Sequence, residues 1–282
     1  MPGTLFVVAT PIGNLEDITA RALRVLREVA LIAAEDTRRT SHLLSRYAIT
    51  TPTTSLHEHN ESQKAASIVE RLKRGDDVAL VSDAGTPTIS DPGQRLVRAA
   101  IEAEIRVESI PGPNAALAAL AVSGFSSDSF TFMGFPPARS KDRSKWFDEV
   151  ARVGGVVVFF EAPHRIRRTL DELQRVAGNC ELLVARELTK KHEELVRGPI
   201  SELLQRLGEP LGEYTVVANM GHTTNIGASQ APSPAELLLE FGVMTKSSHL
   251  TKRAAVSALA RRHNIAPNAV YDILETAKKS VE

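Results

Sequence analysis

Short apolar runs alternate with amphipathic runs through the first half of the chain, and this alternation most limits what the chain can fold into. Buried strands are predicted at residues 4–9, 30–34, 78–82 and 106–110. Between them apolar residues recur at helical spacing, as at Leu23 and Leu26, and again at Ile68 and Leu72. Strands that are apolar on both faces and separated by helices are typical of a largely parallel sheet in an α/β domain.

The second half repeats the alternation and then changes character. Apolar runs at 131–135, 156–160, 181–185 and 214–218 predict a second α/β domain. Residues 221–234 are rich in Gly, Ser, Thr and Pro without periodicity, as in a linker. Helices are expected at about 234–241, 250–263 and 267–279. The predicted domains are 1–121 and 122–221, both α/β, then a linker at 222–232 and a small all-α domain at 233–282.

Two local patterns predict helix starts in the first domain. Asp91-Pro92-Gly93-Gln94 places a capping side chain, a proline at the first helical position and a glutamine at the third. Pro111-Gly112-Pro113 precedes an Ala- and Leu-rich stretch.

Composition excludes several classes of protein. Lys plus Arg and Asp plus Glu number 34 each, so any polyanionic partner must be bound by local basic patches. A single cysteine, Cys180, excludes a disulfide framework and a Cys-rich zinc site. The sequence has no signal-peptide pattern at Met1 and no run of about 18 apolar residues, so we expect a cytoplasmic protein.

Small residues gather where four of the predicted strands end. The segments are residues 9–14, 35–38, 82–93 and 111–115. Ligands of open α/β sheets bind beyond the carboxyl ends of the strands, so these loops predict a pocket for a flat, partly polar molecule held through backbone groups. Alternatively, Gly and Pro at each position only turn the chain.

Motifs for other chemistries are absent. There is no G-x-G-x-x-G after the first strand, no P-loop, no H-E-x-x-H and no G-x-S-x-G in the sequence. His57-Glu58-His59 brings two imidazoles close without an evident third ligand, so no metal site is predicted.

Seven segments resemble one known family. They are VATPIGNLEDIT, AAEDTRRTSHLL, LVSDAGTPTISDPG, SIPGPNAALAALAVSGF, FMGFPP, FFEAPHRI and RELTKKHEE. In this order, from Leu5 to Val217, the chain closely resembles the ribosomal RNA small subunit methyltransferase I family, of the tetrapyrrole-methylase-like class. The resemblance implies transfer of a methyl group from S-adenosylmethionine, held between two α/β domains, to the ribose 2′-hydroxyl of cytidine 1402 in the decoding region of 16S rRNA. It also implies a homodimer and a terminal domain like a helix-turn-helix.

The resemblance implies that S-adenosylmethionine binds at the small-residue loops. The expected donor-binding residues are Pro11, Ser82, Asp83, Ala84, Gly85, Thr86, Pro111, Gly112, Pro113, Asn114 and Ala115. Asp83 could accept a hydrogen bond from a ribose hydroxyl or the donor's amino group. A glycine is expected after Gly85-Thr86-Pro87, where this chain has Thr88.

Transfer to a ribose hydroxyl needs a proton acceptor or an orienting group. The candidates are Glu35, Asp36, His57, Glu161 and Lys190. Glu35 and Asp36 could instead cap and ion-pair a helix start, and His57 could be a plain surface residue. Glu161 is the stronger case, because a carboxylate rarely ends a buried strand without a partner.

RNA contacts must come from local basic patches. The candidates are Arg38, Arg39, Arg139, Lys141, Arg143, Arg165, Lys252, Arg253, Arg261 and Arg262. Such runs are commonly only solvated faces. The run at 139–145 follows a stiff Pro-Pro turn and is interpreted as a mobile loop over the cleft. Two alternative functions stay open, a tetrapyrrole methyltransferase of the precorrin type and a noncatalytic RNA-binding assembly factor.

Overall fold

The computed structural model describes residues 1–208 and 212–221 and, of the terminal region, only Leu237, 240–242, 244–245, 255–256, 259–260, 270–271 and 273–274. Two compact units divide the chain, Met1–Thr223 and Thr224–Glu282.

The first sheet is parallel throughout, with the order β3-β2-β4-β1-β5. Its strands are β1 (Thr4–Val8), β2 (Leu31–Ala34), β3 (Thr53–Ser55), β4 (Val78–Val81) and β5 (Arg106–Ile110). The four strands predicted from the sequence are confirmed, whereas β3 was missed because three residues of Thr and Ser carry no apolar run. All five carboxyl ends therefore meet at one edge of the sheet.

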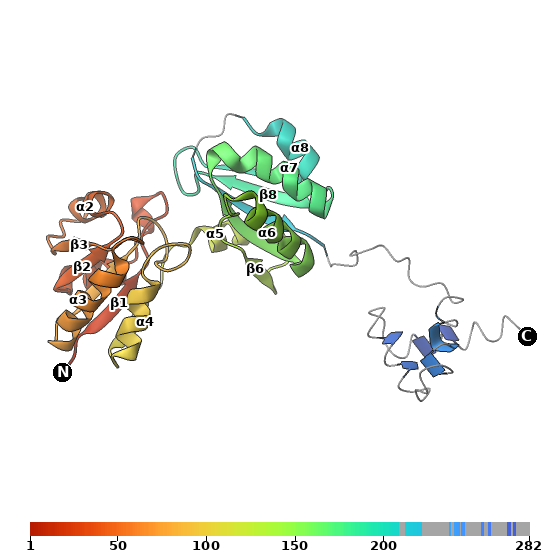
Figure 1. The fold of residues 1–282 in the computed structure, drawn as a ribbon. Helices are drawn as coiled ribbons and strands as arrows, with labels where there is room; N and C mark the ends of the chain where they lie inside the picture. Colours follow the sequence, from red (N-terminus) through yellow and green to blue (C-terminus); the bar gives the residue numbers. More distant parts are fainter. Residues whose placement is uncertain are drawn as a thin grey trace, which may run out of the picture. The chain divides into compact units, whose positions relative to one another are not determined.

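Helices cover both faces of this sheet (Figure 1). They are α1 (Ala20–Glu28), α2 (Thr37–Arg46), α3 (Glu61–Lys73) and α4 (Gln94–Glu102). Side chains alternate along each strand, so Val8 packs in the cluster with α1 and α2, and Leu5 packs in the cluster with α3 and α4. Burial on both faces explains why β2 and β4, in the middle of the sheet, are apolar and buried at every position.

The second sheet is mixed, with the order β6-β7-β10-β8-β9. Its strands are β6 (Phe130–Phe132), β7 (Val156–Glu161), β8 (Glu181–Arg186), β9 (Glu194–Pro199) and β10 (Tyr214–Asn219). Only β6 and β7 pair in parallel, and the other pairs are antiparallel. The sequence missed β9, because an edge strand containing Gly and Pro has no continuous apolar pattern.

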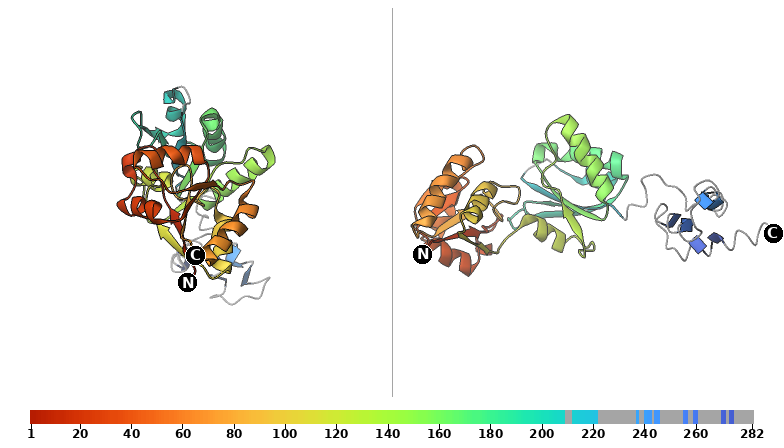
Figure 2. Two further views of the ribbon diagram at one scale, coloured as in Figure 1. Left: turned by 90° about the vertical axis from the view of Figure 1, so that its left-hand side faces the viewer. Right: turned by 60° about the horizontal axis from the view of Figure 1, so that its bottom comes forward.

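Helices also cover both faces of the second sheet, as the further views show (Figure 2). They are α5 (Ala115–Ala121), α6 (Ser140–Val153), α7 (Ile166–Ala177) and α8 (Ile200–Arg206), with short 3₁₀ helices η1 (Leu15–Asp17) and η2 (Pro163–Arg165). Trp146, Leu170 and Leu203 pack on one face, and Ala119 and Leu120 pack on the other.

The segment 139–145 corrects an expectation. It was interpreted as a mobile loop, but residues 140–145 form the first turns of α6. Trp146 and Phe147 anchor this helix because both are buried in the core.

The start of α4 corrects a second expectation, because Asp91 does not cap it. The N-cap residue of α4 is Gly93 (φ 121°), which has no side chain to accept a hydrogen bond from the first turn. Glu61 of α3 performs this role instead, as its Oε1 accepts the backbone N–H groups of Gly93, Arg95 and Leu96 at 3.1, 2.7 and 3.3 Å. The unpaired donors of a helix start are thus satisfied by a carboxylate from another helix, and Asp91 is available to the pocket.

The described residues of the terminal unit are helical and form one apolar cluster that includes Leu237, Val256, Leu259 and Leu274. The predicted linker at 222–232 lies outside the described residues, and so do the predicted helix ends at 234, 250, 263, 267 and 279, so the domain division stays a prediction. In the part of the chain that the structure describes, no helix is both long and apolar enough to cross a bilayer.

Candidate active site

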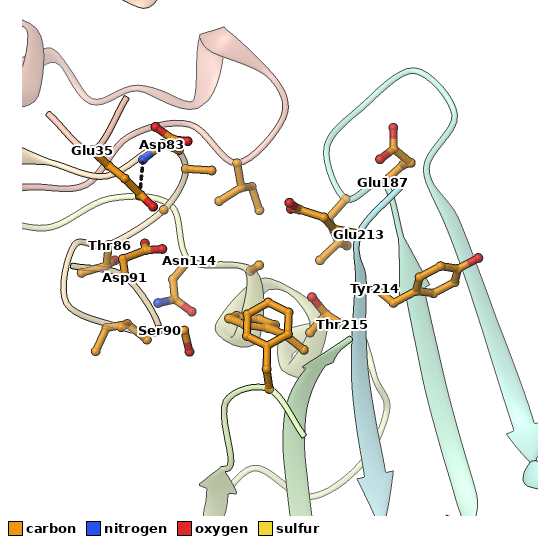
Figure 3. A pocket seen from close by; sticks show the side chains of 18 of the residues that line it. Glu35, Asp83, Thr86, Ser90, Asp91, Asn114, Glu187, Glu213, Tyr214 and Thr215 are labelled. Atoms are coloured by element: carbon orange, nitrogen blue, oxygen red, sulfur yellow. Dashed lines mark hydrogen bonds between the residues drawn. The ribbon is translucent and has the colours of Figure 1, made fainter. Parts of the chain in front are cut away.

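A cavity of about 230 Å³ lies beyond the carboxyl ends of the first sheet, within Met1–Thr223 (Figure 3). Loops after four parallel strands line it through Ile12, Glu35, residues 83–86 with 89–91, and residues 114–115. Its volume is several times the roughly 30 Å³ of one water molecule, so it can hold part of a small organic ligand. The predicted position of the pocket is therefore where the structure has a cavity.

The loops of the first sheet are joined to one another by hydrogen bonds. The backbone N–H of Thr10 donates to Gly85 O at 2.8 Å and that of Gly85 donates to Thr10 O at 3.0 Å. The Thr86 hydroxyl donates to Pro113 O at 3.3 Å. These bonds fix three of the loops as one rigid wall.

The second sheet supplies the opposite wall through Phe135, Phe160, residues 213–215, and the turn between β8 and β9. This turn packs against the loop after β1, where the N–H of Asn14 donates to Thr189 Oγ1 at 3.0 Å. A Cβ at Gly13 would lie 2.6 Å from Leu188 O, so only glycine permits this approach.

A second cavity adjoins the first and shares Ile12, Arg39, Asp83, Ala84, Glu187, Lys190 and Glu213 with it. Pro11, Gly13 and Leu15 extend the lining on this side. The site is therefore longer than the first cavity alone.

Glu35 and Asp83 connect the ends of β2 and β4. The N–H of Asp83 donates to Glu35 Oε2 at 3.2 Å, and the N–H of Asp36 donates to Asp83 Oδ1 at 3.0 Å. Arg39 Nη1 lies 3.3 Å from Asp83 Oδ2. Each carboxylate thus has one oxygen engaged by a neighbouring loop, which fixes its orientation in the cavity.

Carboxylates outnumber cations in this lining. They are Glu35, Asp83, Asp91, Glu187 and Glu213, against Arg39 and Lys190. Lys190 Nζ is paired with Glu187 Oε1 at 2.8 Å. The cavity is therefore suited to a cationic ligand group.

Crowding of acidic groups changes their protonation. Burial raises the pKa of Glu35, and the charge of Asp83 adds to this effect. Burial, followed by the charge of Glu35, raises the pKa of Asp91 to about 7. A carboxyl group that titrates near neutrality in a cavity is typical of a functional site.

Strained backbone gathers in the two facing loops. Thr88 (φ 74°) and Ser90 (φ 64°) belong to the loop after β4, and Glu187 (φ 51°) and Thr189 (φ 65°) belong to the turn after β8. Left-handed conformations of non-glycine residues cost energy and often mark ligand sites. The Thr88 conformation explains why a glycine is expected there.

The structure brings together only part of the predicted donor-binding set. Asp83, Ala84, Gly85, Thr86, Asn114 and Ala115 line the cavity, and Pro11 lines the adjoining one. Ser82, Pro111, Gly112 and Pro113 line neither. Gly112 is small for another reason, because a Cβ there would lie 3.1 Å from the Cβ of Ala9.

The predicted catalytic residues separate into two groups. Glu35 and Lys190 line the cavity, whereas Asp36, His57 and Glu161 do not. Asp36 caps α2 and pairs with Arg38, which lowers the pKa of Asp36 to about 2. His57 lies beside Asn60, with 3.1 Å between Nε2 and Nδ2.

Glu161 differs from the expectation for a residue that contacts the substrate, because its side chain has no exposed surface and lines neither cavity. Its Oε1 pairs with Arg165 Nε at 3.1 Å, and its Oε2 lies 3.7 Å from Arg143 Nη1. Thr169 also donates to this carboxylate. A buried carboxylate at the end of a strand requires a partner, and Glu161 has two, the arginines Arg143 and Arg165.

The predicted RNA contacts divide in the same way. Arg38, Arg139 and Lys141 are exposed, and Arg39 lines the cavity. Arg143 is a correction, because its side chain is 4% exposed and offers no surface to a phosphate. Arg165 is mostly buried against Glu161. Lys252, Arg253, Arg261 and Arg262 lie outside the described residues.

Several lining residues were missed from the sequence, above all those of the second sheet. They include Phe135, Phe160, Glu187, Glu213, Tyr214 and Thr215. No local pattern identifies them, because they reach the cavity only when the two sheets pack together.

In the described residues, no group of three His, Cys, Asp or Glu side chains is arranged to hold a metal ion.

Comparisons with known proteins agree with this geometry. Residues 4–204 match the family described as Tetrapyrrole (Corrin/Porphyrin) Methylases. The Vibrio cholerae protein named Ribosomal RNA small subunit methyltransferase I is 44% identical over 95% of this chain and 92% of its own length. The protein of the same name from Bacillus subtilis is 40% identical over 96% of this chain and 93% of its own length.

Solved structures share the fold at low identity. Uroporphyrin-III-C-methyltransferase from Thermus thermophilus has a TM-score of 0.54 at 19% identity, covering 77% of this chain and 95% of that one. A diphthine synthase has a TM-score of 0.59 at 16% identity, covering 77% and 90%. Together with the relatives above, these matches show that the chain is a methyltransferase of the tetrapyrrole methylase family and belongs with the ribosomal RNA small subunit methyltransferase I proteins.

Proposed function

We propose that this chain transfers a methyl group from S-adenosylmethionine to the ribose 2′-hydroxyl of a cytidine, position 1402, in the decoding region of 16S rRNA within the small ribosomal subunit. Support for the RNA comes from the names of relatives that match nearly the whole chain. Support for the donor comes from the acidic lining of the cavity.

The lining fits this donor. S-adenosylmethionine carries a sulfonium and an ammonium, and five carboxylates around one cavity favour such positive groups. The small side chains of Ala84, Gly85 and Ala115 in the lining leave room for its adenosine portion. When bound, the donor supplies a methyl group already activated by the sulfonium, so no metal is needed.

The residues of the chain then have two tasks, to orient the donor and to accept a proton. Asp83 is held by Asp36 N–H at one oxygen and by Arg39 at the other, and either oxygen can accept a second hydrogen bond from a ribose hydroxyl or an amino group. Glu35 is the favoured proton acceptor, because burial raises its pKa and makes it a stronger base than a solvated carboxylate. Lys190 can stabilise negative charge that develops on the acceptor oxygen.

The tetrapyrrole alternative is disfavoured by charge. Precorrin-type substrates carry several carboxylates, and the cavity already holds an excess of them. A noncatalytic RNA-binding role is disfavoured because a vestigial pocket has no need of strained loops or buried acids. From the resemblance, we further propose that the protein is cytoplasmic and forms a homodimer, and that residues 233–282 bind RNA. Sedimentation equilibrium tests whether it is a dimer.

Transfer of a radioactive methyl group from S-adenosylmethionine to small subunits from a strain lacking this modification tests the proposal. We expect one methyl group per subunit on a cytidine ribose, located by mass spectrometry of nuclease digests. Absence of transfer by folded protein that binds the donor would refute it. Transfer to a precorrin, or absence of donor binding in calorimetry, would establish one of the two alternatives.

A further inference from the structure

An exposed aromatic side chain lies at the rim of the cavity. Phe135 lines it with 49% of its surface exposed, and its ring centroid is 5.4 Å from that of the less exposed Phe160. Ile89 lines the same cavity and is 40% exposed. A Cβ at Gly134 would lie 3.4 Å from Ser90 Oγ, so the loops that carry these two side chains lie close together.

The loop that carries Phe135 is fixed by hydrogen bonds from two directions. Toward the sheet, Met133 N–H donates to Val158 O and Phe160 N–H donates to Gly134 O, each at 2.9 Å. From the helices, Trp146 Nε1 donates to Met133 O at 3.1 Å. The ring is therefore exposed on a rigid backbone rather than on a mobile one.

The buried ion network holds the other end of the same loop. Arg165 donates to Pro136 O, and Arg143 Nη1 donates to Pro137 O at 3.5 Å. Both arginines are paired with Glu161. A ring that only covers a core does not need its loop to be held by buried ion pairs. Holding the loop in this way preorganises the Phe135 ring for binding a ligand.

The segment that follows the ring differs in charge from the interior of the cavity. The interior is acidic, whereas Arg139 and Lys141, four and six residues after Phe135 in the sequence, are exposed. An exposed aromatic ring followed closely in the chain by exposed cations is a combination that can bind unpaired nucleotides, where the ring stacks on a base and the cations contact the backbone phosphates.

We propose that Phe135 stacks on the nucleobase of the acceptor nucleotide, which is presented unpaired, while Ile89 contacts the same base and Arg139 and Lys141 bind the flanking phosphates. This inference rests on the proposed function, since it takes the acceptor to be RNA. Stacking at the rim directs the ribose toward the carboxylates inside the cavity.

The test compares Phe135→Ala, Phe135→Leu and Phe135→Trp in the full chain. Base stacking on one aromatic ring contributes about 1–3 kcal/mol, which corresponds to roughly a 5- to 150-fold change in affinity. We expect Phe135→Ala to raise KM for small subunits, and Kd in filter binding, by a factor in this range. Its Kd for S-adenosylmethionine should change by a smaller factor than its Kd for small subunits, because the ring lies at the rim of the cavity and is half exposed. Phe135→Trp should restore binding and Phe135→Leu should not, because leucine keeps apolar area without a ring.

Phe130→Ala is the matched control, because Phe130 is 38% exposed on β6 and does not line the cavity. Phe130→Ala should leave KM and Kd for small subunits unchanged. Equal subunit binding by wild type and Phe135→Ala would overturn the inference, and so would loss of donor binding, which would assign the ring to the donor. If wild type binds subunits without methyl transfer, the proposed function fails while filter binding still decides the role of Phe135.

Discussion

Replacing Glu161 by alanine should destabilise the protein rather than remove its chemistry. The Glu161 side chain has no exposed surface. Its carboxylate accepts hydrogen bonds from Ala162 N–H at 2.8 Å and from Thr169, and it pairs with Arg143 and Arg165. The variant would leave two arginines facing an empty position.

The magnitude follows from the burial of these partners. Arg143 is 4% exposed and would keep Glu172 as a carboxylate partner, while Arg165, which is 24% exposed, would lose the carboxylate that its Nε contacts at 3.1 Å. Removing one partner of a buried ion pair costs about 3–5 kcal/mol. Since native domains are stable by only about 5–15 kcal/mol, the free energy of unfolding should fall by about a fifth or more. Glu161→Gln should cost less, because it keeps the shape and one acceptor.

Urea unfolding followed by circular dichroism measures the effect, and the midpoint should fall by about 1–2 M for Glu161→Ala. Glu172→Gln is the control and should cost less, because the Glu172 side chain is 20% exposed. The kcat per folded molecule should be unchanged at low temperature. An unchanged free energy of unfolding together with a collapsed kcat would refute this reasoning and return Glu161 to the catalytic candidates.

Four further outcomes are expected. Because burial and Glu35 raise the pKa of Asp91 to about 7, donor affinity should rise about tenfold from pH 6 to pH 8, and calorimetry should find this rise removed in Asp91→Asn. The same pKa shift makes folding stability fall as pH rises from about 4 to 7, because the folded state retains a proton that the unfolded state has lost, and a rising urea midpoint would contradict it. Thr88→Gly should raise the free energy of unfolding by about 1 kcal/mol, since φ is 74° there, and Thr88→Val, expected to lower it, serves as the comparison. Deleting residues 233–282 should lower RNA affinity without changing donor affinity, and an equal loss of both would mean that this segment is part of the core fold.

Four of the five strands of the first sheet, and the position of the cavity at their carboxyl ends, could be predicted from the sequence. Continuous apolar runs identify strands that are buried on both faces, and the carboxyl ends of parallel strands meet at one edge. That geometry places Glu35, Asp83 and Asn114 around one cavity although they are distant in sequence.

The rest depends on tertiary pairing that no local pattern encodes. Asp91 has the sequence of a helix cap, yet Glu61 caps α4 from another helix and leaves Asp91 in the cavity. Arg143 lies in a basic run typical of RNA contacts, but its partner Glu161 is distant in the sequence. The mixed pairing of the second sheet likewise decides which strand ends reach the site.

Titration calorimetry with S-adenosylmethionine tests most directly whether the acidic cavity holds the methyl donor. The account predicts one site per chain in the wild type, and at least about tenfold weaker binding in Asp83→Ala, which loses an acceptor, and in Gly85→Val, which places a branched side chain at φ 84° on the cavity wall. Asp171→Asn, on the exposed surface of α7, should bind as the wild type does. Unchanged affinity in both cavity variants, with folding confirmed, would show that the donor binds elsewhere.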